Sequence, residues 1–91
     1  MKKVTEETYL AVMEAYNWHC VHCLSKENLQ LHHKLSKSKI NQQKYPLFIH
    51  SPINLVPLCI ECHNKYTHLH RITYQQAEMY ENFLKNLLDR T

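Results

Sequence analysis

Two cysteine pairs of identical spacing are the residues in this chain best suited to chemistry. Cys20 and Cys23 form the first pair, and Cys59 and Cys62 form the second. Two residues separate the cysteines of each pair, which lets both sulfurs lie on one side of a tight turn. Two such pairs supply the four thiolates of a tetrahedral zinc site. We therefore expect a structural Zn²⁺ that joins two parts of the chain far apart in sequence.

Two other uses of these cysteines remain open from the residues alone. Disulfide bonds would form in an oxidising compartment, and a single Cys-x-x-Cys pair can be redox-active, although it needs no second pair for that. The residue after the first pair is Leu24, where a glycine often stands. Because a residue with a Cβ must then make the turn, the sequence predicts backbone strain at Leu24.

Histidines outside the cysteine pairs make a second metal site possible. His32 and His33 are adjacent at the end of an expected strand, Asn54 begins a second extended segment, and His63 follows Cys62 directly. If the second cysteine pair lies at the start of a helix, successive residues there are rotated by about 100°. The last cysteine can then face the zinc while His63 faces elsewhere, so two separate metal sites are geometrically compatible.

At these residues the chain resembles the HNH endonucleases, also described as ββα-metal or His-Me finger nucleases. The resemblance covers about Trp18 to His70 and lies in the ordered combination of motifs. These are Cys20-x-x-Cys23, then Leu31-His32-His33-Lys34-Leu35-Ser36, then Asn54-Leu55-Val56-Pro57-Leu58-Cys59-x-x-Cys62-His63.

The resemblance implies a role for each matching residue. His32 corresponds to the first ligand of the catalytic metal, and His33 corresponds to the general base. Asn54 corresponds to the central asparagine that ties down the loop and orients the base. His63 corresponds to a metal ligand carried by the helix. Hydrolysis of a phosphodiester needs such a base and a cation that neutralises charge on the phosphate oxygens.

The ligand set departs from that of some members of the family. Those members have another ligand four residues after the first helix histidine, where this chain has Thr67. His68, one residue further on, is a candidate third ligand, and His50 is an extra histidine in the preceding loop. Imidazole ligands suit Zn²⁺, Ni²⁺, Co²⁺ or Mn²⁺ better than Mg²⁺. We expect one catalytic divalent metal from these five ions, with broad use of transition metals.

The flanking segments have helical patterns. An amphipathic helix is expected within residues 1–17, ending near Asn17, and a C-terminal helix within 73–90, running from about Tyr74 to Asp89. Thr73 and Gln76 resemble a capping box at its start. Short extended segments are expected around Leu29 to His33 and at 54–58, where Pro57 confines the second to an edge or a strand end. The stretch 34–53 is interpreted as a long exposed loop.

These elements predict a single α+β domain over residues 1–91. Its zinc-stapled ββα-metal core, similar to a treble clef, would span 18–70 between the two helices.

With 91 residues, of which 44% are hydrophobic, the chain is too short for a multidomain enzyme and too apolar for disorder. No stretch has the length and apolar character of a membrane span. Glu6, Glu7 and Glu14 interrupt any export signal, so we expect a cytoplasmic protein without a membrane partner.

Positive charge is concentrated between residues 33 and 72. Six basic residues stand there against the single acid Glu61. Such a patch attracts the phosphate backbone without reading base sequence, so the expected partner is duplex DNA. The candidate contacts are Lys34, Lys37, Lys39, Lys44, Lys65 and Arg71. We expect weak specificity unless a partner protein or a second copy of the chain supplies targeting.

The expected function is that of a metal-dependent DNA endonuclease or nickase. By resemblance its host is a bacterium or a phage-infected cell, and its products carry 5′-phosphate and 3′-hydroxyl ends. Two other classes remain open. One is a catalytically silent zinc module that binds nucleic acid through the basic loop, and the other is a zinc-stapled domain whose helices dock a protein partner.

Overall fold

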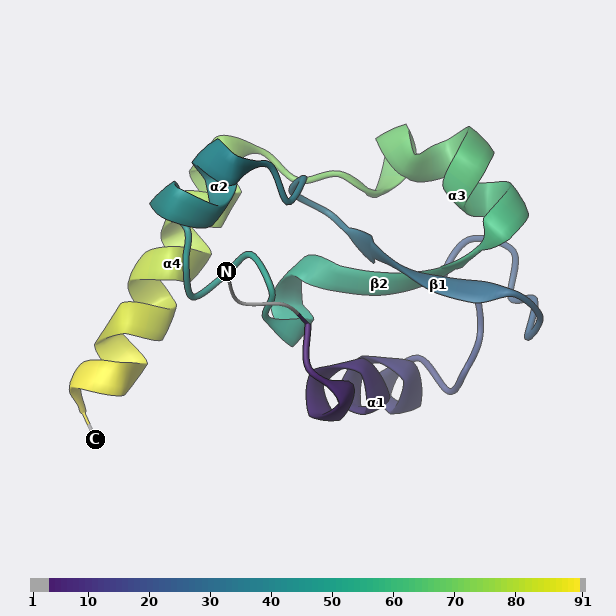
Figure 1. The fold of residues 1–91 in the computed structure, drawn as a ribbon, viewed down its shortest axis with the longest axis horizontal. Coiled ribbons are helices and arrows are strands. Elements are labelled where there is room, and N and C mark those ends of the chain that lie inside the picture. Colours follow the sequence, from purple (N-terminus) through teal and green to yellow (C-terminus); the bar gives the residue numbers. More distant parts are fainter. Residues whose placement is uncertain (1–3, 91) are drawn as a thin grey trace.

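The computed structural model describes residues 4–90 and contains a small α+β fold, in agreement with the predicted class (Figure 1). The ends of the expected segments at residues 1–3 and 91 lie outside the described residues. Short 3₁₀ turns span Pro52–Asn54 and Thr67–His70. The helices and strands are α1 (Glu6–Ala15), β1 (Leu29–His33), α2 (Lys39–Lys44), β2 (Leu55–Cys59), α3 (Ile60–Tyr66) and α4 (Tyr74–Asp89).

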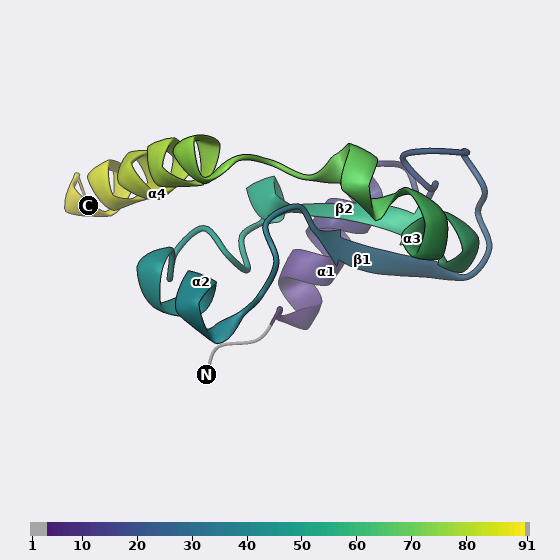
Figure 2. The same ribbon diagram turned by 90° about the horizontal axis from the view of Figure 1, so that it is seen from above.

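A two-stranded antiparallel sheet lies at the centre of the fold. Leu29 pairs with Cys59 and His33 pairs with Leu55, so the last residue of β1 lies beside the first residue of β2. Pro57 stands inside β2, where both strands of a two-stranded sheet are edge strands. Helices α1 and α3 lie on opposite sides of this sheet (Figures 1 and 2). Since α3 begins directly after Cys59, the sheet fixes where α3 presents its side chains.

Local capping chemistry explains where the two flanking helices begin. The Thr5 side chain accepts a hydrogen bond from the N–H of Thr8 at the start of α1. At the start of α4, Thr73 and Gln76 form the predicted capping box, with each side chain bonded to the other residue's backbone N–H. The predicted bounds of the C-terminal helix, Tyr74 to Asp89, are confirmed.

The prediction of a long exposed loop over residues 34–53 is wrong. This segment contains α2, which Ser38 caps by accepting a hydrogen bond from the N–H of Asn41. Several of its apolar side chains are buried and pack against Ala77 of α4, with the partly buried Ile53, Ile72, Tyr80 and Leu84 around them. The buried residues of this hydrophobic core are Leu35, Tyr45, Phe48, Ile49 and Ala77. Burial of these side chains stabilises the segment 34–53, although its lysines and prolines are typical of a loop.

A buried carboxylate connects α4 to the turn that precedes β2. Glu81 is 3% exposed, and its Oε1 accepts hydrogen bonds from the N–H groups of Leu47 and Phe48 at 3.0 and 2.9 Å. Figure 2 shows α4 extending away from the sheet, with its beginning beside the rest of the fold. Helix α4 therefore holds the 46–50 turn in place from outside the sheet and α3.

Candidate functional site

The four predicted zinc ligands come together in one cluster. The sulfur atoms of Cys20, Cys23, Cys59 and Cys62 all lie within 4.8 Å of one another. None of the four is in a disulfide, and Cys23 is the one exposed member. Among the described residues this is the one group of three or more histidine, cysteine or acidic side chains that could hold a metal ion. The predicted four-cysteine cluster is therefore confirmed as a potential metal site.

Backbone contacts fix the two cysteine turns against the sheet. The N–H of Val21 donates to the carbonyl of Pro57 at 2.9 Å, which ties the first turn to β2. Cys59 caps α3, and its Sγ accepts a hydrogen bond from the N–H of Cys62. Burial raises the pKa of the Cys20 thiol, but hydrogen bonds from the backbone of Cys23, Cys59 and His22 outweigh this and lower the pKa to about 6. A thiolate, the form that binds metal, is therefore favoured at neutral pH.

Leu24 carries the strain that the missing glycine predicts. Its φ is 66°, in the left-handed region, and its side chain is 70% exposed.

We expect Leu24→Gly to raise the free energy of unfolding of the zinc-loaded protein by up to about 1 kcal/mol, because glycine adopts this φ without a Cβ clash. Urea denaturation would measure the change. The control is Leu10→Gly, at a helical position of α1, which should lower the free energy of unfolding. If Leu24→Gly also lowered the free energy of unfolding, the result would contradict backbone strain at Leu24.

The environment of His32 suits a metal ligand. This side chain is 7% exposed, and its Nε2 lies 3.1 Å from the backbone carbonyl oxygen of His70. Because a carbonyl can only accept, Nε2–H must donate and Nδ1 is then the unprotonated nitrogen. Histidines that bind metals commonly donate their other N–H to such a group. Burial lowers the pKa of His32, which favours the neutral form that a metal requires.

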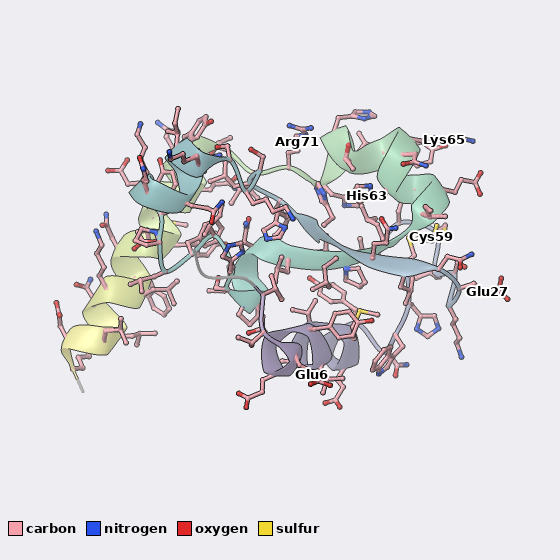
Figure 3. All side chains as sticks on the ribbon, in the orientation of Figure 1. Glu6, Glu27, Cys59, His63, Lys65 and Arg71 are labelled. Carbon is pink, nitrogen blue, oxygen red and sulfur yellow. The ribbon has the colours of Figure 1, made fainter. Side chains whose placement is uncertain are left out.

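His63 lies next to His32 on the facing helix. The centroids of the two rings are 5.7 Å apart and the ring planes are nearly perpendicular. Figure 3 shows His63 on the side of α3 toward the sheet, whereas Lys65 points away from it. The structure thus brings these two predicted ligands together. The exposed His68 does not line the cleft around them, although Thr67 does.

His33 opens onto the same cleft but has different neighbours. Its Nε2 lies 3.1 Å from Nδ1 of His50, which belongs to the turn before β2. Burial, together with the nearby His50, Lys37 and His32, lowers the pKa of His33 to about 4. The imidazole is therefore neutral at pH 7, as a general base must be.

Adjacent residues on a strand point to opposite sides, yet His32 and His33 both line this cleft. They do so at the end of β1, next to an open edge of the two-stranded sheet. His32 contacts the α3 side, where His63 and the carbonyl of His70 lie. His33 contacts the loop side, where His50 lies. The two rings thus line one cleft although they contact different parts of the chain.

Asn54 is fully buried and joins the chain at Leu35, beside the cleft, to the turn at Ile49. Its Oδ1 accepts a hydrogen bond from the N–H of Leu35 at 2.8 Å. Its Nδ2 donates to the carbonyls of Leu35 at 3.1 Å and of Ile49 at 2.8 Å. One amide therefore joins the chain after His33 to the chain before His50.

Replacing Asn54 by alanine should destabilise the fold strongly. The change leaves three buried backbone groups without a partner, and each such group costs roughly 1–3 kcal/mol. We expect the free energy of unfolding of the zinc-loaded protein to fall by about 3 kcal/mol or more, measured by urea denaturation. Asn82→Ala, at an exposed position of α4, is the matched control and should change stability by less than about 0.5 kcal/mol. Equal stability of the two variants would contradict the clamp.

The cleft that contains these histidines has a volume of about 930 Å³. Its other lining comes from the segment around the start of α1, from β1 and the residues after it, and from α3 and the residues after it. Three of the six predicted DNA contacts belong to its wall, namely Lys34, Lys37 and Arg71. Cationic side chains therefore stand beside the histidines in the wall of this cleft.

The other three predicted DNA contacts lie outside the cleft. Lys65 forms an ion pair with Glu61 at 3.2 Å on the exposed side of α3. Lys44 lines a separate small pocket that includes Glu78 and Glu81, and Lys39 is exposed at the start of α2. The structure thus divides the basic patch into a part at the cleft and a part away from it.

No family model, curated protein or solved structure matches this chain. In the described part of the chain, no helix is both long enough and apolar enough to cross a bilayer. The interpretation of the cleft therefore depends on its own geometry.

Sequence reasoning misses two partners in this site. The carbonyl of His70, which accepts from His32, belongs to the backbone and leaves no sequence signal. His50 stands out in the sequence only as an extra histidine in the loop, although it lies four residues before Asn54. The short spacing between His50 and Asn54 is a sequence signal that could have identified His50 as part of the site.

Proposed function

We propose that this protein is a metal-dependent DNA endonuclease of the HNH type, acting as a nickase or a double-strand nuclease. The observation that carries the proposal is the cleft itself, in which His32, His33 and His63 gather beside basic side chains. The buried Asn54 clamp next to it supports the same assignment. A two-stranded sheet followed directly by α3 is the arrangement that the ββα-metal resemblance requires.

In this mechanism His33 acts as the general base. The neutral ring accepts a proton from a water molecule, and the resulting hydroxide attacks the phosphorus atom of the phosphodiester. Lys37 and Arg71 hold the phosphate by charge-assisted hydrogen bonds. The bond to the 3′ oxygen breaks and this oxygen takes a proton from solvent, so the products carry 5′-phosphate and 3′-hydroxyl ends.

His32 and His63 are the residues that would hold the catalytic metal. The hydrogen bond from His32 Nε2 to the His70 carbonyl leaves Nδ1 free for this role. When bound, a divalent cation supplies electrostatic stabilisation for the phosphate and the departing 3′ oxygen. The four-cysteine cluster would hold a separate, structural Zn²⁺.

A series of metals tests this proposal. Plasmid nicking by zinc-loaded protein should be supported by Mn²⁺, Ni²⁺ or Co²⁺, because imidazole nitrogens bind these ions well. Activity with Mg²⁺ and none with the transition metals would contradict His32 and His63 as ligands. Products with 3′-phosphate ends would contradict the mechanism.

The divided basic patch gives a second test. We expect Lys37→Gln combined with Arg71→Gln to weaken DNA binding and to lower the slope of log affinity against log salt by roughly 0.9 for each phosphate that the variant no longer neutralises. Lys39→Gln combined with Lys44→Gln removes the same charge outside the cleft and is the matched control. Fluorescence anisotropy with a labelled duplex measures both. An equal decrease of affinity in the two double variants would contradict DNA binding at the cleft.

One observation favours the runner-up function, a silent zinc module that binds nucleic acid. Within residues 4–90, no third histidine, cysteine or acidic side chain joins His32 and His63 in a metal-binding group. Water would have to complete the coordination shell in an active nuclease. DNA binding without cleavage in any of the metals would favour this alternative.

A further inference from the structure

We propose that His50 is a positioning residue that fixes the tautomer of His33, so that Nδ1 of His33 is the nitrogen that accepts the proton. This inference deepens the proposed function and rests on His33 acting as the base. The two rings are held at 3.1 Å between His33 Nε2 and His50 Nδ1, and their planes are nearly perpendicular.

The direction of this hydrogen bond decides which nitrogen of His33 is basic. If His50 donated from Nδ1, the neutral His33 would carry its own proton on Nδ1 and would have no lone pair for the cleft. If His33 donates from Nε2, its Nδ1 is unprotonated and can accept a proton from water. Only the second arrangement is compatible with a base at His33. His50 Nδ1 is therefore the acceptor.

The backbone holds the two rings in this arrangement. Asn54 binds the carbonyl of Ile49, the residue before His50, and both backbone groups of Leu35, two residues after His33. The hydroxyl of Ser51 also donates to the carbonyl of Phe48 at 2.8 Å, which tightens the turn around His50. One buried amide thus connects the backbone near His33 to the backbone next to His50. Hydrogen bonds thus hold the backbone near both histidines, and neither ring is on a fully exposed side chain.

His50 acts through His33 and does not touch the reacting phosphate. When His33 takes a proton from water, it becomes a cation with an N–H on each nitrogen. The Nδ1 lone pair of His50 then stabilises the charge at His33 Nε2, in the way that a third group orients and supports a catalytic base. Removal of this acceptor should slow the chemical step and leave DNA binding intact.

Two substitutions of His50 separate this role from simple packing. His50→Phe keeps an aromatic ring but removes the acceptor, whereas His50→Asn places an amide oxygen near the position of Nδ1. Under single-turnover conditions with saturating Mn²⁺, we expect His50→Phe to slow nicking roughly 10- to 100-fold, which is part of the roughly 10²–10⁴ that general base catalysis contributes. The DNA dissociation constant should stay unchanged, and His50→Asn should restore most of the rate. His50→Phe that nicks as fast as the wild type would overturn the proposal.

A second readout does not depend on cleavage. Nitrogen-15 NMR of the imidazoles in the zinc-loaded protein, without added second metal, reports which ring nitrogen carries the proton. We expect His33 in the Nε2–H form in the wild type and a shift toward the Nδ1–H form in His50→Phe. A wild-type His33 in the Nδ1–H form would overturn the proposal even if the protein cleaves DNA. Absence of cleavage with the Nε2–H form present would refute the nuclease function but support the hydrogen bond from His33 to His50.

Discussion

Replacing His33 by alanine is expected to reduce plasmid nicking by about 100-fold or more, because general base catalysis contributes roughly 10²–10⁴ to such reactions. His33 lines the cleft and burial keeps it neutral at pH 7, with its pKa lowered to about 4. DNA affinity and zinc content should be unchanged, since no cationic or cysteine side chain is altered. A nicking assay beside an anisotropy titration measures the two effects separately.

The control for this variant is His19→Ala, because His19 does not line the cleft. It should nick at the wild-type rate. Nicking by His33→Ala at the rate of His19→Ala would assign the base to another residue. Loss of DNA binding together with nicking would instead indicate that His33 supports the fold of the cleft.

Removal of the metal from the four-cysteine cluster should have the largest effect on stability. The cluster joins the turn at Cys20 and Cys23 to β2 and α3, and Leu58 packs against it in a small core. Apparent binding free energies of structural Zn²⁺ are about 10–16 kcal/mol, similar to or larger than the stability of a small domain. We expect a strong chelator to abolish the cooperative thermal unfolding transition, as followed by circular dichroism.

Cys62→Ser tests the same cluster by mutation. This substitution removes one buried thiol of the cluster and should reproduce the loss of the unfolding transition in zinc-containing buffer. His19→Ala, next to Cys20 in sequence but without a thiol, should unfold at the wild-type temperature. A cooperative transition that survives both chelation and Cys62→Ser would refute a structural role for metal.

Elements governed by local chemistry can be predicted from the sequence. Helix α4 begins at the capping box of Thr73 and Gln76, and β1 spans the alternating segment from Leu29 to His33. The cysteine spacing is sufficient to predict the four-sulfur cluster, because such a cluster depends on short turns. The positive φ of Leu24 follows from the same turn geometry.

The rest depends on contacts between distant residues. Leu35, Tyr45 and Phe48 have neither helical nor strand periodicity, so their burial against α4 is not visible in the sequence. His33 and His50 are 17 residues apart in sequence, and Asn54 binds the backbone near each of them, at Leu35 and Ile49. Hydrogen bonds to backbone groups place no demand on the residue type there, which is why this part of the site appears only in the structure.

The most direct test of the nuclease assignment is plasmid relaxation by the zinc-loaded wild-type protein, with and without added Mn²⁺. Relaxed circles, or linear plasmid if both strands are cut, should accumulate only with the added metal. DNA ligase should seal the breaks because they carry 5′-phosphate and 3′-hydroxyl ends. Supercoiled plasmid that remains uncut in both samples, while the protein binds it and retains one zinc, would contradict the assignment and leave a nucleic-acid-binding module.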